Sequence, residues 1–337
     1  MNSQPLSRTQ FAPPPVATGL LGRDLVSTRD IAPKEAETIL HLAGLMKSRP
    51  ADFRSALAGK QIAMFFEKPS LRTRITFEAG MASLGGLAIF VDQTQERLGI
   101  RESLCDIAHN LERWVDGIVL RTFAHATVEN MAEHAAIPVI NALSEIEHPC
   151  QALADYFTLQ ERFADLKSIT LAYVGDGNNV AHSLLLTCAL LGSKMRIATP
   201  PGYEPDVQIV ADARGIARRT GAVIELMDDP QEAVAGVDAI YTDAWTSMGH
   251  EKEAAERGLV FPPYQLNHEL AAFAASHAVF MHCLPAHRGQ EITDAVMDCE
   301  RSIVFDQAES RLHVQKAILM LLLGGKPNRM PVRSAHA

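Results

Sequence analysis

The chain has 337 residues, of which 47% are hydrophobic and 21% are charged; this is the composition of an ordinary globular protein, with a length typical of two domains. Its formal net charge of −9 argues against a general nucleic-acid-binding protein. The five cysteines are widely spaced, odd in number and without a Cys-x-x-Cys pair, so we expect a reducing compartment and neither a disulfide framework nor a zinc site.

Residues 1–24 are expected to form a flexible extension. The segment is polar and proline-rich, and it lacks the hydrophobic core of a signal peptide. The longest apolar runs elsewhere, such as residues 318–323, are too short to cross a bilayer. We therefore predict a cytoplasmic protein that binds no membrane.

After the extension, short apolar runs typical of buried strands alternate with stretches of helical periodicity. The expected strands are 61–66, 87–91, 117–120 and 138–141, followed by 169–174, 194–199, 223–227, 239–242, 279–283 and 303–306. The expected helices are 33–47, 72–84, 102–114, 128–136, 149–163, 180–191, 206–220 and 308–323.

This alternation predicts an α/β fold with two similar-sized domains, each a parallel sheet with helices on both faces. The domains are expected at 25–150 and 151–307, with a C-terminal helix, 308–324, completing the first. Ligands of such sheets bind outside the carboxyl ends of the strands. We therefore expect the active site in the cleft between the domains, and polar motifs directly after strands are its candidates.

Ser70-Leu71-Arg72-Thr73-Arg74 follows the first expected strand and opens a helix. A helix start offers unpaired backbone N–H groups and the positive end of the helix dipole, so it suits a phosphate or another oxyanion. Ser70 alone is also explained as an N-cap. Arg72 and Arg74 are not, because cations are unfavourable at a helix start, and we interpret the motif as an anion site.

Polar groups after later strands of this half point to the same site. Arg121 directly follows a buried run, and its position favours a convergent anion site over a surface charge. His148 and Gln151 flank the proline that starts a helix, and we expect this pair to bind a carbonyl or amide group. Asp155, four residues after Gln151, either orients a neighbour or is solvated.

The turn Gly175-Asp176-Gly177-Asn178-Asn179 also follows an expected strand. It has two glycines of a dinucleotide-binding fingerprint, but Val180 stands where the third glycine would be, so the signal is weak. The asparagines can bind a small zwitterion as well as a nucleotide, and a tight turn with an Asn cap is the alternative.

The loop 243–249 follows another expected strand. Asp243 suits an ammonium group. Ser247 and the backbone near Met248 suit that ammonium group or a carboxylate, and Gly249 gives the loop freedom to close over a ligand.

His282-Cys283-Leu284-Pro285 ends a further strand. Cys283 is a candidate nucleophile, substrate contact or core residue. Adjacent residues of a strand point to opposite faces, which argues against a Cys–His couple. Arg311 lies near the start of the last helix, where it either reaches the cleft or forms an exposed pair with Glu309.

Together and in this order, the motifs 70–74, Arg121, 148–151, 243–249 and 282–285 resemble those of the carbamoyltransferase family, over residues 25–323. The resemblance implies transfer of the carbamoyl group of carbamoyl phosphate to the side-chain amine of ornithine, giving citrulline and phosphate, in arginine biosynthesis or degradation. It implies an enzyme that needs no metal or cofactor and binds no nucleic acid. It also implies that the protein assembles as a homotrimer or as an assembly of trimers.

The resemblance also implies residue roles. Arg121, His148, Asp243 and Cys283 would be catalytic: the first two polarise the carbonyl, and the last two favour the neutral form of the attacking amine, whose free pKa is about 10.4. The implied carbamoyl phosphate site comprises Ser70, Leu71, Arg72, Thr73, Arg97, Arg121, His148, Gln151, Cys283, Leu284 and Arg311. The implied ornithine site comprises Asn179, Asp243, Ser247 and Met248.

Two positions depart from the family pattern. Leu71 stands where many relatives have threonine, which changes little if the position contributes only its backbone amide. Arg97 stands where relatives often have glutamine or histidine reaching the neighbouring subunit's site. An arginine there can still bind phosphate across a trimer interface.

Other functions stay open at this point. Putrescine would leave the 243–249 loop less to bind, and an N-acylated ornithine would offer Asp243 no ammonium group, so ornithine fits best. A nicotinamide-dependent dehydrogenase needs a ribose-binding acid after the next strand, where Ala198-Thr199-Pro200 stands. A non-catalytic metabolite-binding relative would be indicated by loss of the phosphate-binding arginines or of Cys283, and both are present.

Overall fold

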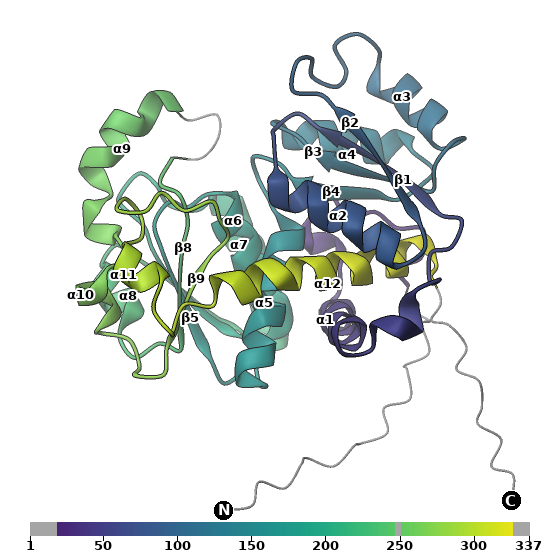
Figure 1. Cartoon of the computed structure of the whole chain (residues 1–337). Helices are drawn as coiled ribbons and strands as arrows, with labels where there is room; N and C mark the ends of the chain where they lie inside the picture. The colour runs from purple at the N-terminus through teal and green to yellow at the C-terminus, as the bar shows by residue number, and fades with distance from the viewer. Residues whose placement is uncertain (1–18, 247–250, 326–337) are drawn as a thin grey trace, which may run out of the picture.

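The computed structural model of the chain describes residues 19–246 and 251–325. Two α/β units lie side by side, each built on its own parallel sheet (Figure 1). The strand order is β2-β1-β3-β4 in the first sheet and β7-β6-β5-β8-β9 in the second, and every neighbouring pair is parallel. The predicted fold class is confirmed.

The first unit has the strands β1 (Gln61–Phe66), β2 (Leu87–Asp92), β3 (Gly117–Arg121) and β4 (Val139–Leu143), and the helices α1 (Pro33–Ser48), α2 (Leu71–Ser83), α3 (Leu104–Leu111) and α4 (His125–His134). The second has the strands β5 (Thr170–Val174), β6 (Lys194–Ala198), β7 (Val223–Met227), β8 (Ala239–Thr242) and β9 (Val279–His282). Its helices are α6 (Asn179–Leu191), α7 (Val207–Thr220), α8 (Pro230–Val234), α9 (Ala254–Val260), α10 (His268–Ala271) and α11 (Asp294–Met297). Helices α5 (Pro149–Phe163) and α12 (Val304–Leu323) connect the units, and short 3-10 turns lie at Thr28–Asp30, Pro50–Phe53, Glu251–Glu253 and Pro262–Tyr264.

Strands β1, β3 and β4 of the first sheet are buried on both faces, which explains why they read as unbroken apolar runs. Ile62 and Met64 of β1 belong to a core shared with α1, α2 and α12, whereas Ala63 and Phe65 belong to a second core with α3 and α4. Alternate side chains of a strand point to opposite faces, so one short strand contributes to two cores.

Helix α12 ties the two units together. It begins beside β9 of the second unit and runs along α5 to α1 and α2 of the first (Figure 1). Side chains on α12 are therefore placed where the two units meet.

The expected strand at 303–306 is wrong, because these residues lead into and form the first turn of α12. Val304 is 1% exposed and Phe305 is 70% exposed, and the next buried side chains are Gln307 and Ser310. This spacing of three residues fits a helix and not the alternation of a strand. Packing against the core therefore overrides the β-propensity of Ile303-Val304-Phe305.

Leu20 and Gly22, near the end of the expected N-terminal extension, contact the folded part of the chain. Leu20 is 1% exposed, and the N–H of Gly22 donates to the carbonyl of Leu322 at 3.0 Å. Residues 1–18 lie outside the described part. Within the described ranges, no helix combines the length and apolar character needed to span a membrane.

Candidate active site

The start of α2 carries the predicted anion motif. Ser70 is the N-cap, and its Oγ accepts the N–H of Thr73 at 3.3 Å. The Leu71 side chain is 74% exposed, so this position brings its backbone amide rather than its side chain to the helix start.

Arg74, included in the anion motif, has its own partners in the structure. Its Nε donates to the Oε1 of Glu78 at 2.9 Å, one turn along the same helix, and its guanidinium carbon lies 3.7 Å from the centroid of the Phe90 ring. Its charge is paired on its own helix, and its part in an anion site stays a prediction.

Arg72, Arg121 and Arg311 form a group of cations near Thr73. Arg121 is 5% exposed and Arg311 is 3% exposed, and the Nη2 of Arg311 donates to the Oγ1 of Thr73 at 2.6 Å. Burial, and then repulsion by Arg311 and Arg72, lowers the pKa of Arg121 to about 9. Burial, followed by repulsion from Arg72, also lowers the pKa of Arg311.

This group is complementary to an anion. The Nε atoms of Arg121 and Arg311 are buried without a hydrogen-bond partner, and an unpaired buried donor is costly. A bound anion would supply partners for these donors and offset the repulsion among the guanidiniums.

His148 and Gln151 lie at the start of α5. The His148 N–H donates to the Oγ of Ser183 at 2.8 Å. Burial, and then the charges of Arg311 and Arg121, keep the pKa of His148 well below its ordinary value. The imidazole is therefore neutral at physiological pH, and its Nδ1 is buried without a partner.

Asp155 is fully buried and bonds the Gln151 side chain. It therefore orients a neighbour, which was one of the two interpretations of this residue. It accepts hydrogen bonds from Gln151, Gln307 and Tyr241. Burial raises the pKa of Asp155 to about 7, while these three hydrogen bonds lower it. Gln307 and Tyr241 were not candidates, because they are distant in sequence and no local motif marks them.

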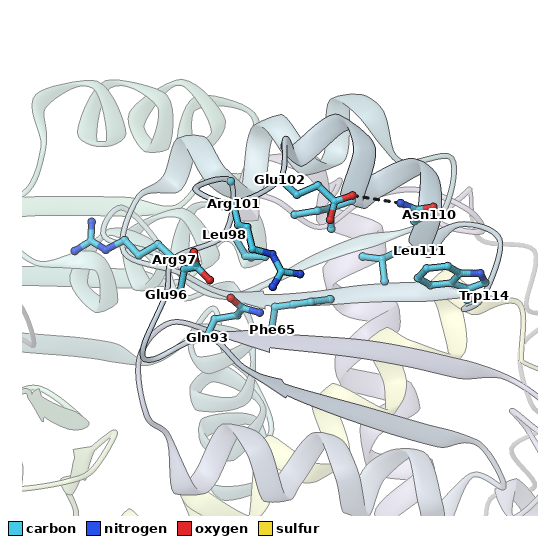
Figure 2. Close-up of a pocket in the computed structure, with 12 residues that line it drawn as sticks. Phe65, Gln93, Glu96, Arg97, Leu98, Arg101, Glu102, Asn110, Leu111 and Trp114 are labelled. Carbon is cyan, nitrogen blue, oxygen red and sulfur yellow. Dashed lines mark hydrogen bonds between the residues drawn. The ribbon is translucent and has the colours of Figure 1, made fainter.

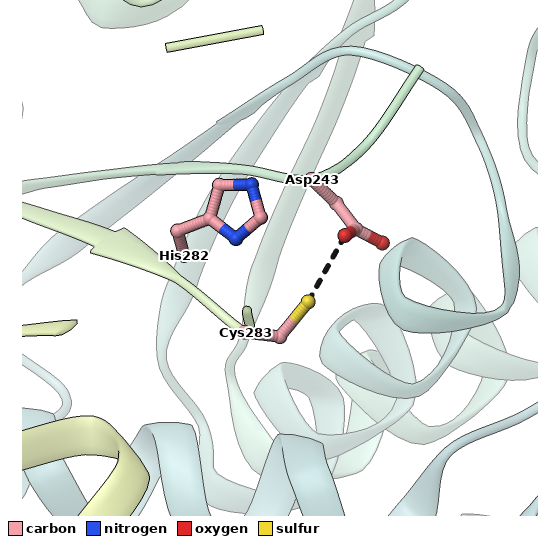
Figure 3. Close-up of side chains that lie close together, drawn as sticks. All are labelled: Asp243, His282 and Cys283. Carbon is pink, nitrogen blue, oxygen red and sulfur yellow. Dashed lines mark hydrogen bonds between the residues drawn. The ribbon is translucent and has the colours of Figure 1, made fainter. Parts of the chain in front are cut away.

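Asp243, just after β8, lies against Cys283, just after β9 (Figure 3). The Sγ of Cys283 donates to the Oδ1 of Asp243 at 3.0 Å, and the Nδ2 of Asn178 donates to its Oδ2 at 2.8 Å. Burial, and then Asp243, raise the pKa of Cys283 well above its ordinary value. The thiol is therefore protonated at neutral pH, which favours a substrate contact over a nucleophile.

The two asparagines of the 175–179 turn have different partners. Asn178 caps α6, which is the alternative interpretation of this turn, and it also contacts Asp243. Asn179, the expected ornithine ligand, donates its Nδ2 to the carbonyl of Ser144 in the first unit at 2.6 Å. An Asn cap at a strand-to-helix turn was the available signal for Asn178.

The His282 ring is held on both sides. Its Nδ1 accepts the N–H of Leu284 at 2.9 Å, and its Nε2 lies 3.0 Å from the Oε1 of buried Glu291. Leu284 has a φ of 59° and precedes a cis peptide bond. The argument from opposite strand faces does not apply, because β9 ends at His282 and Cys283 lies beyond it; the two engaged nitrogens exclude a Cys–His couple instead.

Asp243, His282 and Cys283 place potential metal-ligand atoms within 4.8 Å of one another. Both His282 nitrogens already have partners, so a metal would have to displace one of them. The expectation of an enzyme without metal or cofactor stays a prediction.

Arg97 follows β2, and its guanidinium carbon lies 4.3 Å from the centroid of the Phe123 ring. It borders a cavity of about 290 Å³, and Figure 2 shows its side chain extending away from Arg101. Its role at a neighbouring subunit stays a prediction. Ser247 and Met248, expected to bind ornithine, lie outside the described residues.

Comparisons with known proteins cover nearly the whole chain. Family models match at residues 23–161 (Aspartate/ornithine carbamoyltransferase, carbamoyl-P binding domain) and 167–322 (Aspartate/ornithine carbamoyltransferase, Asp/Orn binding domain). The ornithine carbamoyltransferase of Thermococcus kodakarensis is 48% identical over 92% of this chain and 99% of that protein, and that of Carboxydothermus hydrogenoformans is 49% identical over 90% and 98%. The structure of ornithine carbamoyltransferase from Pyrococcus furiosus matches with a TM-score of 0.88 and 47% identity, covering 92% of this chain and all of that one. The chain therefore belongs to the aspartate/ornithine carbamoyltransferase family.

Proposed function

We propose that the chain is an ornithine carbamoyltransferase, which transfers the carbamoyl group of carbamoyl phosphate to the side-chain amine of L-ornithine and gives L-citrulline and phosphate. The observation that carries the proposal is the group of half-buried Arg72 with buried Arg121 and Arg311, whose Nε donors at Arg121 and Arg311 lack partners. The relatives named ornithine carbamoyltransferase support ornithine as the acceptor.

In this proposal the first unit, 25–150 completed by 308–324, binds carbamoyl phosphate. The phosphate is held by the start of α2, where the helix dipole and backbone N–H groups favour an anion. Arg121, His148 and Gln151 bind the carbamoyl group. The phosphate ligands are Ser70, the Leu71 amide, Arg72, Thr73 and Arg311, with Cys283 and Leu284 near the reacting centre.

The second unit, 151–307, presents ornithine, with Asp243 binding its α-ammonium group and with Asn179, Ser247 and Met248 as further ligands. The neutral side-chain amine attacks the carbonyl carbon, a C–N bond forms, and negative charge develops on the carbonyl oxygen, where Thr73, Arg121 and His148 stabilise it. The C–O bond to phosphate then breaks, and the amine proton leaves on the departing phosphate. Positioning of both substrates supplies much of the acceleration.

An amine-panel assay tests the acceptor. Purified protein is supplied with carbamoyl phosphate and, separately, with ornithine, N-acetylornithine, putrescine or aspartate, and the carbamoylated product and phosphate are measured. Ornithine is expected to give the highest kcat/KM. Product with putrescine or N-acetylornithine but not with ornithine would reassign the acceptor, and no phosphate release with any amine would end the proposal.

The assembly and location belong to the same proposal. We propose a homotrimer or an assembly of trimers in the cytoplasm, in which Arg97 binds the phosphate held by a neighbouring subunit. Light scattering of the purified protein measures the assembly, and a stable monomer would contradict it.

A further inference from the structure

The Asp155 carboxylate receives hydrogen bonds from three directions. Its Oδ1 accepts from the Nε2 of Gln151 and from the Nε2 of Gln307, both at 2.7 Å. Its Oδ2 accepts from the hydroxyl of Tyr241 at 3.0 Å. These donors lie on α5, α12 and β8, so the carboxylate lies where both units and the last helix meet.

A backbone group that cannot rotate sets the direction of these bonds. The N–H of His282 donates to the Oε1 of Gln307 at 2.9 Å, so the Nε2 of Gln307 must face Asp155. The Oδ1 of Asp155 is therefore an acceptor, and it binds the nitrogen of Gln151 rather than its oxygen. The Oε1 of Gln151 is left buried without a partner, at the same helix start as His148.

We propose that Asp155 and Gln307 are positioning residues that fix the Gln151 amide with its oxygen toward the carbamoyl group. This inference rests on the function proposed above. The carbamoyl –NH2 is a donor and matches an acceptor oxygen, whereas acetyl phosphate has a methyl group in its place and leaves that oxygen unpaired. The chain of hydrogen bonds from His282 to Gln151 thereby makes the site prefer carbamoyl phosphate to acetyl phosphate.

The double variant Asp155→Asn/Gln307→Glu reverses the donor-to-acceptor direction of these hydrogen bonds. The net charge of the two residues stays the same. The carboxylate introduced at position 307 accepts the His282 N–H with one oxygen and an N–H of the amide introduced at position 155 with the other. The second N–H of that amide donates to the Oε1 of Gln151, which turns the Gln151 nitrogen toward the carbamoyl group. Asp155→Asn alone keeps the original direction, because Gln307 still presents its nitrogen.

The readout is the KM for carbamoyl phosphate in citrulline formation, compared with the inhibition constants of acetyl phosphate and of inorganic phosphate. In the double variant we expect the KM to rise by about tenfold or more, with both inhibition constants unchanged. Asp155→Asn alone should keep the wild-type preference for carbamoyl phosphate over acetyl phosphate. Thr158→Val is the matched control, since the Thr158 hydroxyl is buried on the same helix and bonds only the Ala154 carbonyl among the described residues.

Citrulline formation by the double variant with an unchanged preference for carbamoyl phosphate would overturn the inference. An equal loss in Thr158→Val or in Asp155→Asn would also overturn it, because general loosening of α5 would then be the cause. If the double variant does not fold, Asp155→Leu provides a second test. Without its acceptor the Gln151 amide can rotate, so an unchanged preference for carbamoyl phosphate over acetyl phosphate would count against the inference. Wild-type protein that forms no citrulline contradicts the proposed function instead.

Discussion

The Nη2 of Arg311 donates a 2.6 Å hydrogen bond to the Oγ1 of Thr73, although the two residues lie 238 positions apart. Both side chains are buried. The bond joins α12 to the first turn of α2, so the proposed phosphate site is complete only when the last helix is docked.

Thr73→Val removes the acceptor of this bond at nearly constant volume. We expect the KM for carbamoyl phosphate to rise about tenfold to a hundredfold, because Arg311 loses its partner and the phosphate loses a hydroxyl. Steady-state kinetics at saturating ornithine measure it. Thr76→Val is the control, since the Thr76 hydroxyl bonds the carbonyls of Arg72 and Thr73 within its own helix; equal effects of the two variants would contradict the prediction.

Inorganic phosphate should raise the melting temperature. Burial lowers the pKa values of Arg72, Arg121 and Arg311, and repulsion from neighbouring arginines lowers those of Arg121 and Arg311 further; a bound anion would favour the charged form of all three. At a hundred times its Kd a ligand adds about 2.7 kcal/mol to the free energy of unfolding. Differential scanning calorimetry in phosphate and in sodium chloride of equal ionic strength checks this.

Without phosphate, Arg72→Gln should raise the free energy of unfolding by about 1 kcal/mol and so raise the melting temperature. The reason is that the substitution removes the repulsion between Arg72 and the buried Arg121 and Arg311. The same variant should lose the phosphate-dependent increase. A phosphate effect of the wild-type size in Arg72→Gln would show that phosphate stabilises the protein elsewhere.

Asp243→Asn should speed alkylation of Cys283 by iodoacetamide at pH 8 several-fold. Burial and the Asp243 carboxylate hold the pKa of Cys283 high, so removing the negative charge lowers that pKa and increases the thiolate fraction. Mass spectrometry of labelled peptides gives the rate. Cys105 and Cys299, which are partly exposed, are internal controls whose rates should stay constant; no acceleration at Cys283 would refute the assigned cause.

Glu291→Leu should lower the free energy of unfolding by about 3 kcal/mol and reduce kcat, because it leaves the His282 ring and the His287 N–H without their buried acceptor. The His282 ring in turn holds the Leu284 amide. Urea unfolding and kinetics measure the two effects. Glu291→Gln keeps an acceptor oxygen and should cost less in both, and an equal loss in both variants would show that the charge matters rather than the bond.

Arg97→Ala should raise the KM for carbamoyl phosphate. An unchanged KM would reject the proposed role of Arg97. Mixed oligomers give a sharper test. Chains with Arg97→Ala and chains with Arg72→Ala are each expected to be weakly active, and refolding them together should restore part of the activity, because some interfaces then pair an intact Arg97 with an intact Arg72. No recovery would place both arginines in the site of one chain.

The parts of the site that could be predicted are those with local signals. Ser70 was recognisable as a helix cap and Arg121 as the end of a buried strand, because strands covered on both faces read as unbroken apolar runs. The structure confirms the cap and the strand end. Leu284 was expected just after a strand and lies there, whereas Cys283 was expected as the last residue of that strand and lies just beyond it.

Features set by tertiary contacts could not be predicted. The Gln307–Asp155 bond spans 152 residues, and nothing near either residue marks the other. Arg74 has the same local setting as Arg72, and only its bond to Glu78 and its contact with Phe90 decide where it points. The apolar residues at 303–305 favour a strand by propensity alone, and their packing in α12 decides otherwise.

The path of α12 has a consequence for the order of assembly during translation. The ribosome makes both sheets before it makes this helix, so a nascent chain can fold each sheet while Arg311 and Gln307 are still missing. A newly made chain therefore cannot hold the mixed anhydride fully until α12 has been made and has docked on both sheets.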